Sequence, residues 1–183
     1  MLRALFTLLA LSLPATAQTV PDQATAKREL FDTRGAQVVA TAHDFLTEAD
    51  FATLQALPKV AQLKYYGAMA AHPPSGLQSE RTQGAFNFHS VEAARAAALR
   101  TCGRGCVIVA DIVPRGYRPG RSLTLNQDAS RAVDGRDFRR AGPNATLAIS
   151  EETGAWALGD GGSAALATCA ARGARDCVVA VSR

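Results

Sequence analysis

Two stretches of the chain show the same succession of apolar and polar positions. In the later one, TLAIS and GAWAL place apolar side chains at alternate positions, as in strands with one buried face. The polar tripeptide between them is followed by Gly154, which predicts a hairpin connection. An alanine-rich run after Ser163 and the closing VVAV then predict a helix and a third strand.

The earlier stretch has the same order. AMA and GAFNF predict two strands, the run from Ser90 to Leu99 predicts an alanine-rich helix, and VIVADIV predicts a third strand. The insertion HPPSGLQSERTQ separates its first two strands. We therefore predict one mature domain, 18–183, that contains two ββαβ-like repeats at about 64–113 and 143–183.

The alanine-rich helices are thin enough to lie close on a sheet. Side by side, the two units predict an α+β fold, a mainly antiparallel sheet with these helices on one face. Ser90 and Ser163 are predicted N-caps, and Gly103 and Gly173 are predicted helix stops.

The connecting segments carry weaker patterns. Thr47 and Asp50 form a capping-box pattern at the start of a helix predicted within 44–62. Residues 122–141 predict a short strand, SLTL, and a polar helix around 129–140. Residues 18–26 are expected to be a loose tail.

The N-terminus has the pattern of a secretory signal peptide. Arg3 precedes an apolar run from Ala4 to Leu13, and the small residues of Ala15-Thr16-Ala17 follow a proline. We expect a signal peptide at 1–17, cleavage near Ala17/Gln18, and a mature protein in the periplasm or outside the cell. No later segment is apolar over the length that a membrane span requires.

The four cysteines, Cys102, Cys106, Cys169 and Cys177, are an even number in a chain expected to be exported, which favours disulfides. Three connectivities remain open from the sequence, and the repeat favours the two local pairs. A zinc site or a redox pair is the alternative, but neither spacing is the C-x-x-C that both usually use.

Charge excludes one class of partner. Removal of Arg3 with the signal peptide leaves 19 basic and 16 acidic side chains, a net charge of +3. This is too little for a nucleic-acid-binding surface, so we expect no nucleic acid as a partner.

The loop PRGYRPGR is the strongest candidate binding feature. Arg115, Arg118 and Arg121 surround Tyr117, so guanidinium groups and a ring could hold an anionic group of an envelope component or partner protein. The alternative is a solvated connecting loop. Asp111, within the apolar VIVADIV, is expected to have an arginine partner.

Catalytic and metal-binding residues are less well supported. His43, His72 and His89 are expected to be separate surface or edge residues, so we expect no metal site. We predict a non-enzymatic binding or structural module. The alternative is a small periplasmic enzyme with a cleft between the repeats, served by His72, Glu80 or Arg81.

The GA-[WF] motif, the alanine-rich helix, the two cysteines and the valine-rich strand together resemble a bacterial family of exported domains of unknown function. The mature chain, including KYYGAMA and FRRAGPNATLAIS, is similar to small alphaproteobacterial exported proteins, some of which carry the label 5-aminolevulinate synthase. That activity requires a lysine that binds pyridoxal phosphate as a Schiff base. The three lysines, Lys27, Lys59 and Lys64, lie in no recognisable phosphate-binding context, so we expect no cofactor.

Overall fold

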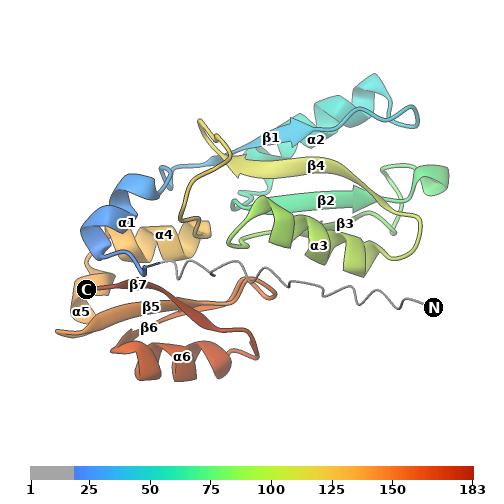
Figure 1. The fold of residues 1–183 in the computed structure, drawn as a ribbon. Coiled ribbons are helices and arrows are strands. Elements are labelled where there is room, and N and C mark those ends of the chain that lie inside the picture. Colours follow the sequence, from blue (N-terminus) through green and yellow to red (C-terminus); the bar gives the residue numbers. More distant parts are fainter. Residues whose placement is uncertain (1–18) are drawn as a thin grey trace, which may run out of the picture.

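The structure is a computed structural model that describes residues 19–183, so the predicted signal peptide lies outside the described residues (Figure 1). The described chain forms two antiparallel sheets with helices, which confirms the predicted α+β class. The elements are α1 (Gln23–Glu29), β1 (Ala36–Ala40), α2 (Glu48–Val60), β2 (Gly67–Ala71), a 3-10 turn η1 (Pro73–Ser75), β3 (Gln83–Ala85), α3 (Val91–Cys102), β4 (Val107–Pro114), α4 (Gln127–Asp134), α5 (Asp137–Arg140), β5 (Ala145–Ile149), β6 (Trp156–Asp160), α6 (Gly162–Ala170) and β7 (Val178–Ser182). Among residues 19–183, none of the helices combines the length and apolar character needed to cross a bilayer.

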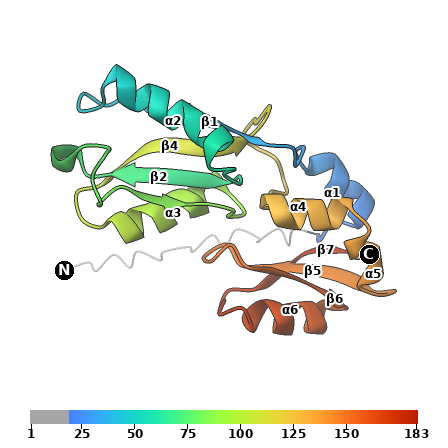
Figure 2. The ribbon, with the colours of Figure 1, turned by 180° about the vertical axis from the view of Figure 1, so that it is seen from behind.

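The first sheet has the strand order β1-β4-β2-β3. Alternate residues of β2 reach opposite faces: Ala68 and Ala70 pack in the cluster that includes α3, whereas Met69 and Ala71 pack with Leu54 of α2. Helices α2 and α3 therefore cover opposite faces of this sheet, as the two opposite views show (Figures 1 and 2).

The second sheet has the strand order β6-β5-β7. On one face Ala148 packs with Ala165 and Cys169 of α6. On the other face Leu147 packs in a larger cluster with Phe138 and with residues of α1 and α4. Helix α6 and the group formed by α1, α4 and α5 thus enclose this sheet (Figure 1).

The structure differs from the predicted single sheet with helices on one face. The outer edge of β4 pairs with β1, a strand that the sequence analysis did not predict, so it is not free to pair with the second unit. Both faces of each sheet are apolar and both are covered. The orders β2-β3-α3-β4 and β5-β6-α6-β7 match the predicted succession, and in each the first strand lies between the other two. Their equivalence as a repeat stays a prediction.

Several local predictions are wrong. The expected loose tail contains the start of α1, whose N-cap Asp22 accepts a hydrogen bond from the Thr25 N–H group (2.7 Å). SLTL pairs with no described strand; there Leu123 and Leu125 pack on the second sheet instead. The polar helix is two helices, since α4 ends before Gly135.

Helix ends were predicted more successfully for α2 and α3 than for α6. The Thr47–Asp50 capping box is confirmed, the Ser90 hydroxyl caps α3, and Gly103 ends that helix with φ +86°. In the second segment, however, α6 begins after Gly161, so Ser163 is a helical residue and not the cap.

The structure has the two local disulfides that the sequence favours, Cys102–Cys106 and Cys169–Cys177. Each joins the last turn of an alanine-rich helix to the residue directly before the returning strand. The two pairs indicate an oxidising, non-cytoplasmic compartment.

Candidate functional site

The arginine-rich loop begins at the end of β4. A hydrogen bond from the Tyr117 N–H group to the Pro114 carbonyl (3.1 Å) closes its first turn. Gly116 has φ +71° within that turn, a left-handed conformation that glycine adopts without a steric penalty. The turn leaves Arg115 and Arg118 exposed and buries part of Tyr117 and Arg121.

Tyr117 and Arg121 fasten this loop to the segment that follows α1. The Tyr117 ring lies 5.7 Å from the Phe31 ring and 5.8 Å from the Tyr66 ring. The Arg121 guanidinium carbon lies 3.6 Å from the Phe31 ring centroid, and this side chain also donates a hydrogen bond to the Glu29 carbonyl.

The structure thus divides the four residues predicted to bind an anion. Tyr117 and Arg121 make contacts within the protein, and burial raises the pKa of the Tyr117 hydroxyl, which keeps it neutral. Arg115 and Arg118 remain exposed. Of these two, Arg115 lies beside a groove, which the sequence analysis did not anticipate.

Arg115 lines an open cavity of about 580 Å³ together with residues of β1 and α2. We call this cavity the basic groove; it is lined by Gly35, Ala36, Gln37, Val38, Gln55, Lys59 and Arg115. The position of a Cβ atom on Gly35 would be 3.4 Å from Nε of Arg115, so this side chain lies close to the start of β1. The groove thus combines a sheet edge with two cationic side chains.

The lining of the basic groove contains no neutralising group, although the hydrogen bond from Arg34 and, to a smaller extent, the charge of Arg115 lower the pKa of the Asp32 carboxyl, which pairs with Arg34. No carboxylate lines the groove, and neither Lys59 nor Arg115 forms an ion pair with a carboxylate of residues 19–183. The amide groups of Gln37 and Gln55 add hydrogen-bond donors to the same lining. Such a lining favours an anionic ligand.

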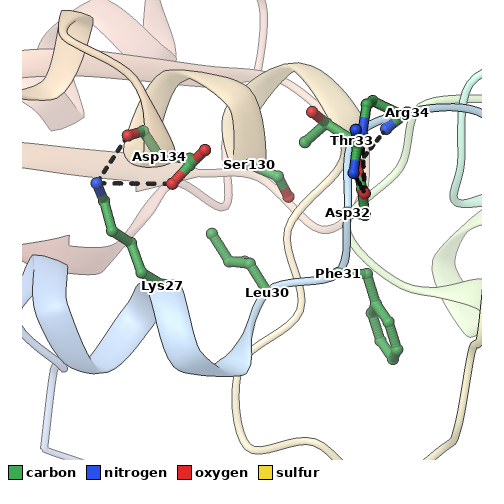
Figure 3. A pocket seen from close by; sticks show the side chains of 8 residues that line it. All are labelled: Lys27, Leu30, Phe31, Asp32, Thr33, Arg34, Ser130 and Asp134. Carbon is green, nitrogen blue, oxygen red and sulfur yellow. Dashed lines mark hydrogen bonds and ion pairs between the residues drawn. The ribbon is translucent and has the colours of Figure 1, made fainter.

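A second cavity, of about 460 Å³, lies between α1, the segment after it and α4 (Figure 3). Its charged groups are paired within the protein. Lys27 Nζ donates to the Asp134 carbonyl (2.7 Å) and lies 3.6 Å from its carboxylate, and Arg34 pairs with Asp32 at 2.6 Å. The Ser130 hydroxyl donates to the Leu125 carbonyl. Because these groups already have partners, this cavity is a weaker candidate.

A third cavity, of about 820 Å³, follows β7 and the segments 19–22 and 122–124. Its lining includes the exposed Val20 and Val178 and the carboxyl-bearing residues Asp22, Glu29 and Glu151. Burial raises the pKa of the Glu151 carboxyl. No lysine or arginine lines this cavity, so its chemistry is opposite to that of the basic groove.

A buried polar cluster joins the two sheets. Asn126, the N-cap of α4, donates from Nδ2 to the carbonyls of Asn87 and Gly154 (2.9 Å each), and its Oδ1 accepts from the Ala129 N–H group (2.7 Å). We call these contacts, with those of His89, the buried joint. It lies inside the protein and offers no binding surface.

The prediction that His89 lies at the surface or at a strand edge is wrong, since its side chain is fully buried. Nδ1 accepts the Asn126 N–H group, and Nε2 donates to the Ala155 carbonyl (3.1 Å). Burial lowers the pKa of His89 to about 4. His89 is therefore a neutral structural residue at neutral pH.

The residues named for an enzymatic cleft do not line any of the three cavities described above. His72 contacts the Ser75 hydroxyl (2.8 Å), and Arg81 donates to the Arg104 carbonyl (3.0 Å); both belong to the insertion that contains Glu80. His43 contacts the Ile108 carbonyl. In the described part of the chain, no group of three or more His, Cys, Asp or Glu side chains is placed to hold a metal ion.

Asp111 has the arginine partner that the sequence predicts. Arg95 on α3 binds its carboxylate through Nε (2.8 Å) and a terminal nitrogen, and the hydrogen bond raises the pKa of the guanidinium. Asp111 is therefore neutralised by a residue of α3 and is not free to bind a ligand. The basic groove remains the strongest candidate site.

Comparison with known proteins adds no identification: no family model, curated protein or solved structure matches the chain.

Proposed function

We propose that this protein is an exported binding module that acts in the periplasm after cleavage between Ala17 and Gln18, and that it catalyses no reaction. The two disulfides support export, because such bonds persist outside the reducing cytoplasm. The order of charge, apolar run and small residues before Gln18 supports the signal peptide.

The basic groove binds the ligand, which presents an anionic group of an envelope component or partner protein. The observation that carries this proposal is the presence of Lys59 and Arg115 in one lining that contains no carboxylate. The guanidinium group supplies paired donors for a planar anion, and the ammonium group supplies a mobile charge.

Charge alone gives only weak binding at this site. An exposed ion pair contributes about 0.2–1 kcal/mol, whereas association costs at least about 4 kcal/mol in lost translational and rotational freedom. Two such pairs therefore steer a ligand to the groove without retaining it. Further contacts beside the cations must supply the remaining affinity.

A charge-matched pair of double variants tests the proposed function. The mature protein is titrated with fluorescent hexaglutamate and with phosphatidylglycerol vesicles at low salt. Replacement of both cations, Lys59→Gln with Arg115→Gln, is expected to weaken binding of at least one probe tenfold or more. The control, Arg136→Gln with Arg139→Gln, removes the same charge from exposed positions in and before α5 and should stay within twofold. Equal effects of the two double variants would exclude the groove as the site.

A further inference from the structure

We infer that the ligand of the basic groove is an extended acidic peptide segment that adds as a fifth strand to the open edge of β1. The inference rests on the proposed anion binding in the same groove and names the chemistry of the ligand. The juxtaposition that carries it is an edge strand beside two cations that form no ion pair within residues 19–183.

The backbone of β1 presents unpaired groups to the groove. Among the described strands β1 pairs only with β4, and the Thr41 N–H group donates to the Val109 carbonyl (2.8 Å). Because paired residues alternate along an antiparallel ladder, the peptide groups of Val39 and Gln37 also face β4. Those of Ala36, Val38 and Ala40 therefore point away from it.

Proline supports this assignment independently. Pro114 stands opposite Ala36 in the register, and a residue without an N–H group fits a position where no ladder hydrogen bond is needed. Three residues at alternate positions, all with outward peptide groups along one edge, are the template that an added strand requires.

The groove lies where such a strand would lie. Ala36, Gln37 and Val38 line it together with Gln55 and Lys59 of α2, so this end of the strand borders the cavity. An added strand needs a spacing of about 4.8 Å from its neighbour. The cavity of about 580 Å³ at the start of β1, next to Gly35 and Arg115, is where we place such a strand.

The two faces of β1 specify the side chains of the added strand. Val38 and Ala40 pack on the side of α2, the helix that carries Gln55 and Lys59 one turn apart. Val39 points to the opposite face and is 49% exposed. A strand with carboxylates on the side of α2 and apolar residues beside Val39 satisfies both faces. The expected motif alternates acidic and apolar residues.

A phosphate group or lipid headgroup fits these observations less well. Either could contact Lys59 and Arg115 and accept from an outward N–H group, but neither would also donate to the outward carbonyls along β1 or cover Val39. A peptide uses all three features, so the structure favours it. Binding of phosphatidylglycerol vesicles without binding of an acidic peptide would overturn the inference.

Amide hydrogen exchange of the mature, isotope-labelled protein tests the pairing residue by residue. The probe is a seven-residue capped peptide of alternating Val and Glu. Addition of the peptide is expected to slow exchange at Ala36, Val38 and Ala40 at least fivefold more than at Gln37 and Val39. A uniform change along β1, or none, at peptide concentrations that saturate binding would overturn the added strand.

Peptide backbones supply a second test that does not depend on protein variants. Two further peptides keep every side chain but carry N-methyl groups on all Glu or on all Val residues, and thus block one edge or the other. One of them should bind at least tenfold more weakly than the parent and the other within about threefold. If the two bind alike, strongly or weakly, no strand is added.

The two proposals can fail separately. Suppose that the parent peptide binds and that the Lys59–Arg115 double variant binds it more weakly, but that neither hydrogen exchange nor N-methylation shows an alternating effect. Anion binding in the groove is then supported, and strand addition is excluded. If the double variant binds the peptide as well as the unaltered protein, the proposed function falls.

Discussion

The segment from β2 to β4 and the segment from β5 to β7 have the same order of elements and a disulfide at the same place, yet their outer edges differ. In the first segment the eight-residue β4 pairs with β1, so the sheet gains a strand and presents a new edge beside the basic groove. In the second, β7 ends beside the short segment Pro21–Asp22, with a single bridge to Ser182. Residues outside the two segments therefore decide how the outer edge of each sheet is paired.

The largest expected change in stability comes from the buried joint, because Asn126 contacts both segments. Asn126→Ala would leave the carbonyls of Asn87 and Gly154 without their donor and remove the cap of α4. We expect a loss of about 4 kcal/mol in the free energy of unfolding. Urea denaturation measures it. Asn144→Ala, at an exposed position, should change the value by less than about 0.5 kcal/mol, and an equal loss in both variants would contradict this prediction.

We expect acid to lower the free energy of unfolding through His89, which belongs to the same buried joint. His89 stays neutral in the folded protein down to a pKa of about 4, whereas in the unfolded chain it takes up a proton near pH 6.5. Stability is therefore lost as pH falls from about 6.5 to about 4, by roughly 3 kcal/mol from this group. Urea titrations across that range measure the loss. In His89→Gln the dependence should shrink, and an unchanged slope would show that other groups cause it.

The disulfides sharpen the comparison because they occupy equivalent places but close loops of different length. In the chain-entropy model, Cys102→Ala with Cys106→Ala costs about 2 kcal/mol and Cys169→Ala with Cys177→Ala about 2.5 kcal/mol. Denaturation of both double variants, without reductant, measures the two values. Full stability in either variant would show that its disulfide does not constrain the unfolded chain.

The smallest expected effect concerns the two serines that the sequence predicts as caps. Ser90 accepts the Ala93 N–H group at the start of α3, so Ser90→Ala should destabilise the protein by about 1 kcal/mol. Ser163 is exposed and lies inside α6, where Ser163→Ala should change stability by less than about 0.5 kcal/mol. Thermal melts of the two variants compare them directly, and equal shifts would contradict the different roles.

Features with local causes were predictable from the sequence. The capping box of Thr47 and Asp50, the Ser90 cap and the Gly103 stop depend on residues within one helical turn of each other. The local disulfides and the arginine partner of Asp111 follow from compartment and burial, which the sequence also indicates.

Features that depend on distant partners could not be predicted from the sequence. The five residues of β1 are too short to stand out, and β4, the strand that stabilises them, begins at Val107. The basic groove was missed for the same reason, since Lys59 and Arg115 come together only after this pairing. One feature of the buried joint was predictable: an asparagine such as Asn126, directly before a helical pattern, is a preferred N-cap.

The position of the buried joint predicts how the protein behaves after cleavage of the chain between β4 and β5. The connection between β4 and β5 resembles a linker, yet Asn126 within it contacts residues on both sides. A protease cut in the exposed Arg118–Gly120 stretch should therefore leave the two pieces bound to each other, and they should melt in a single cooperative transition. Neither piece produced alone would retain the contact between Asn126 and Asn87.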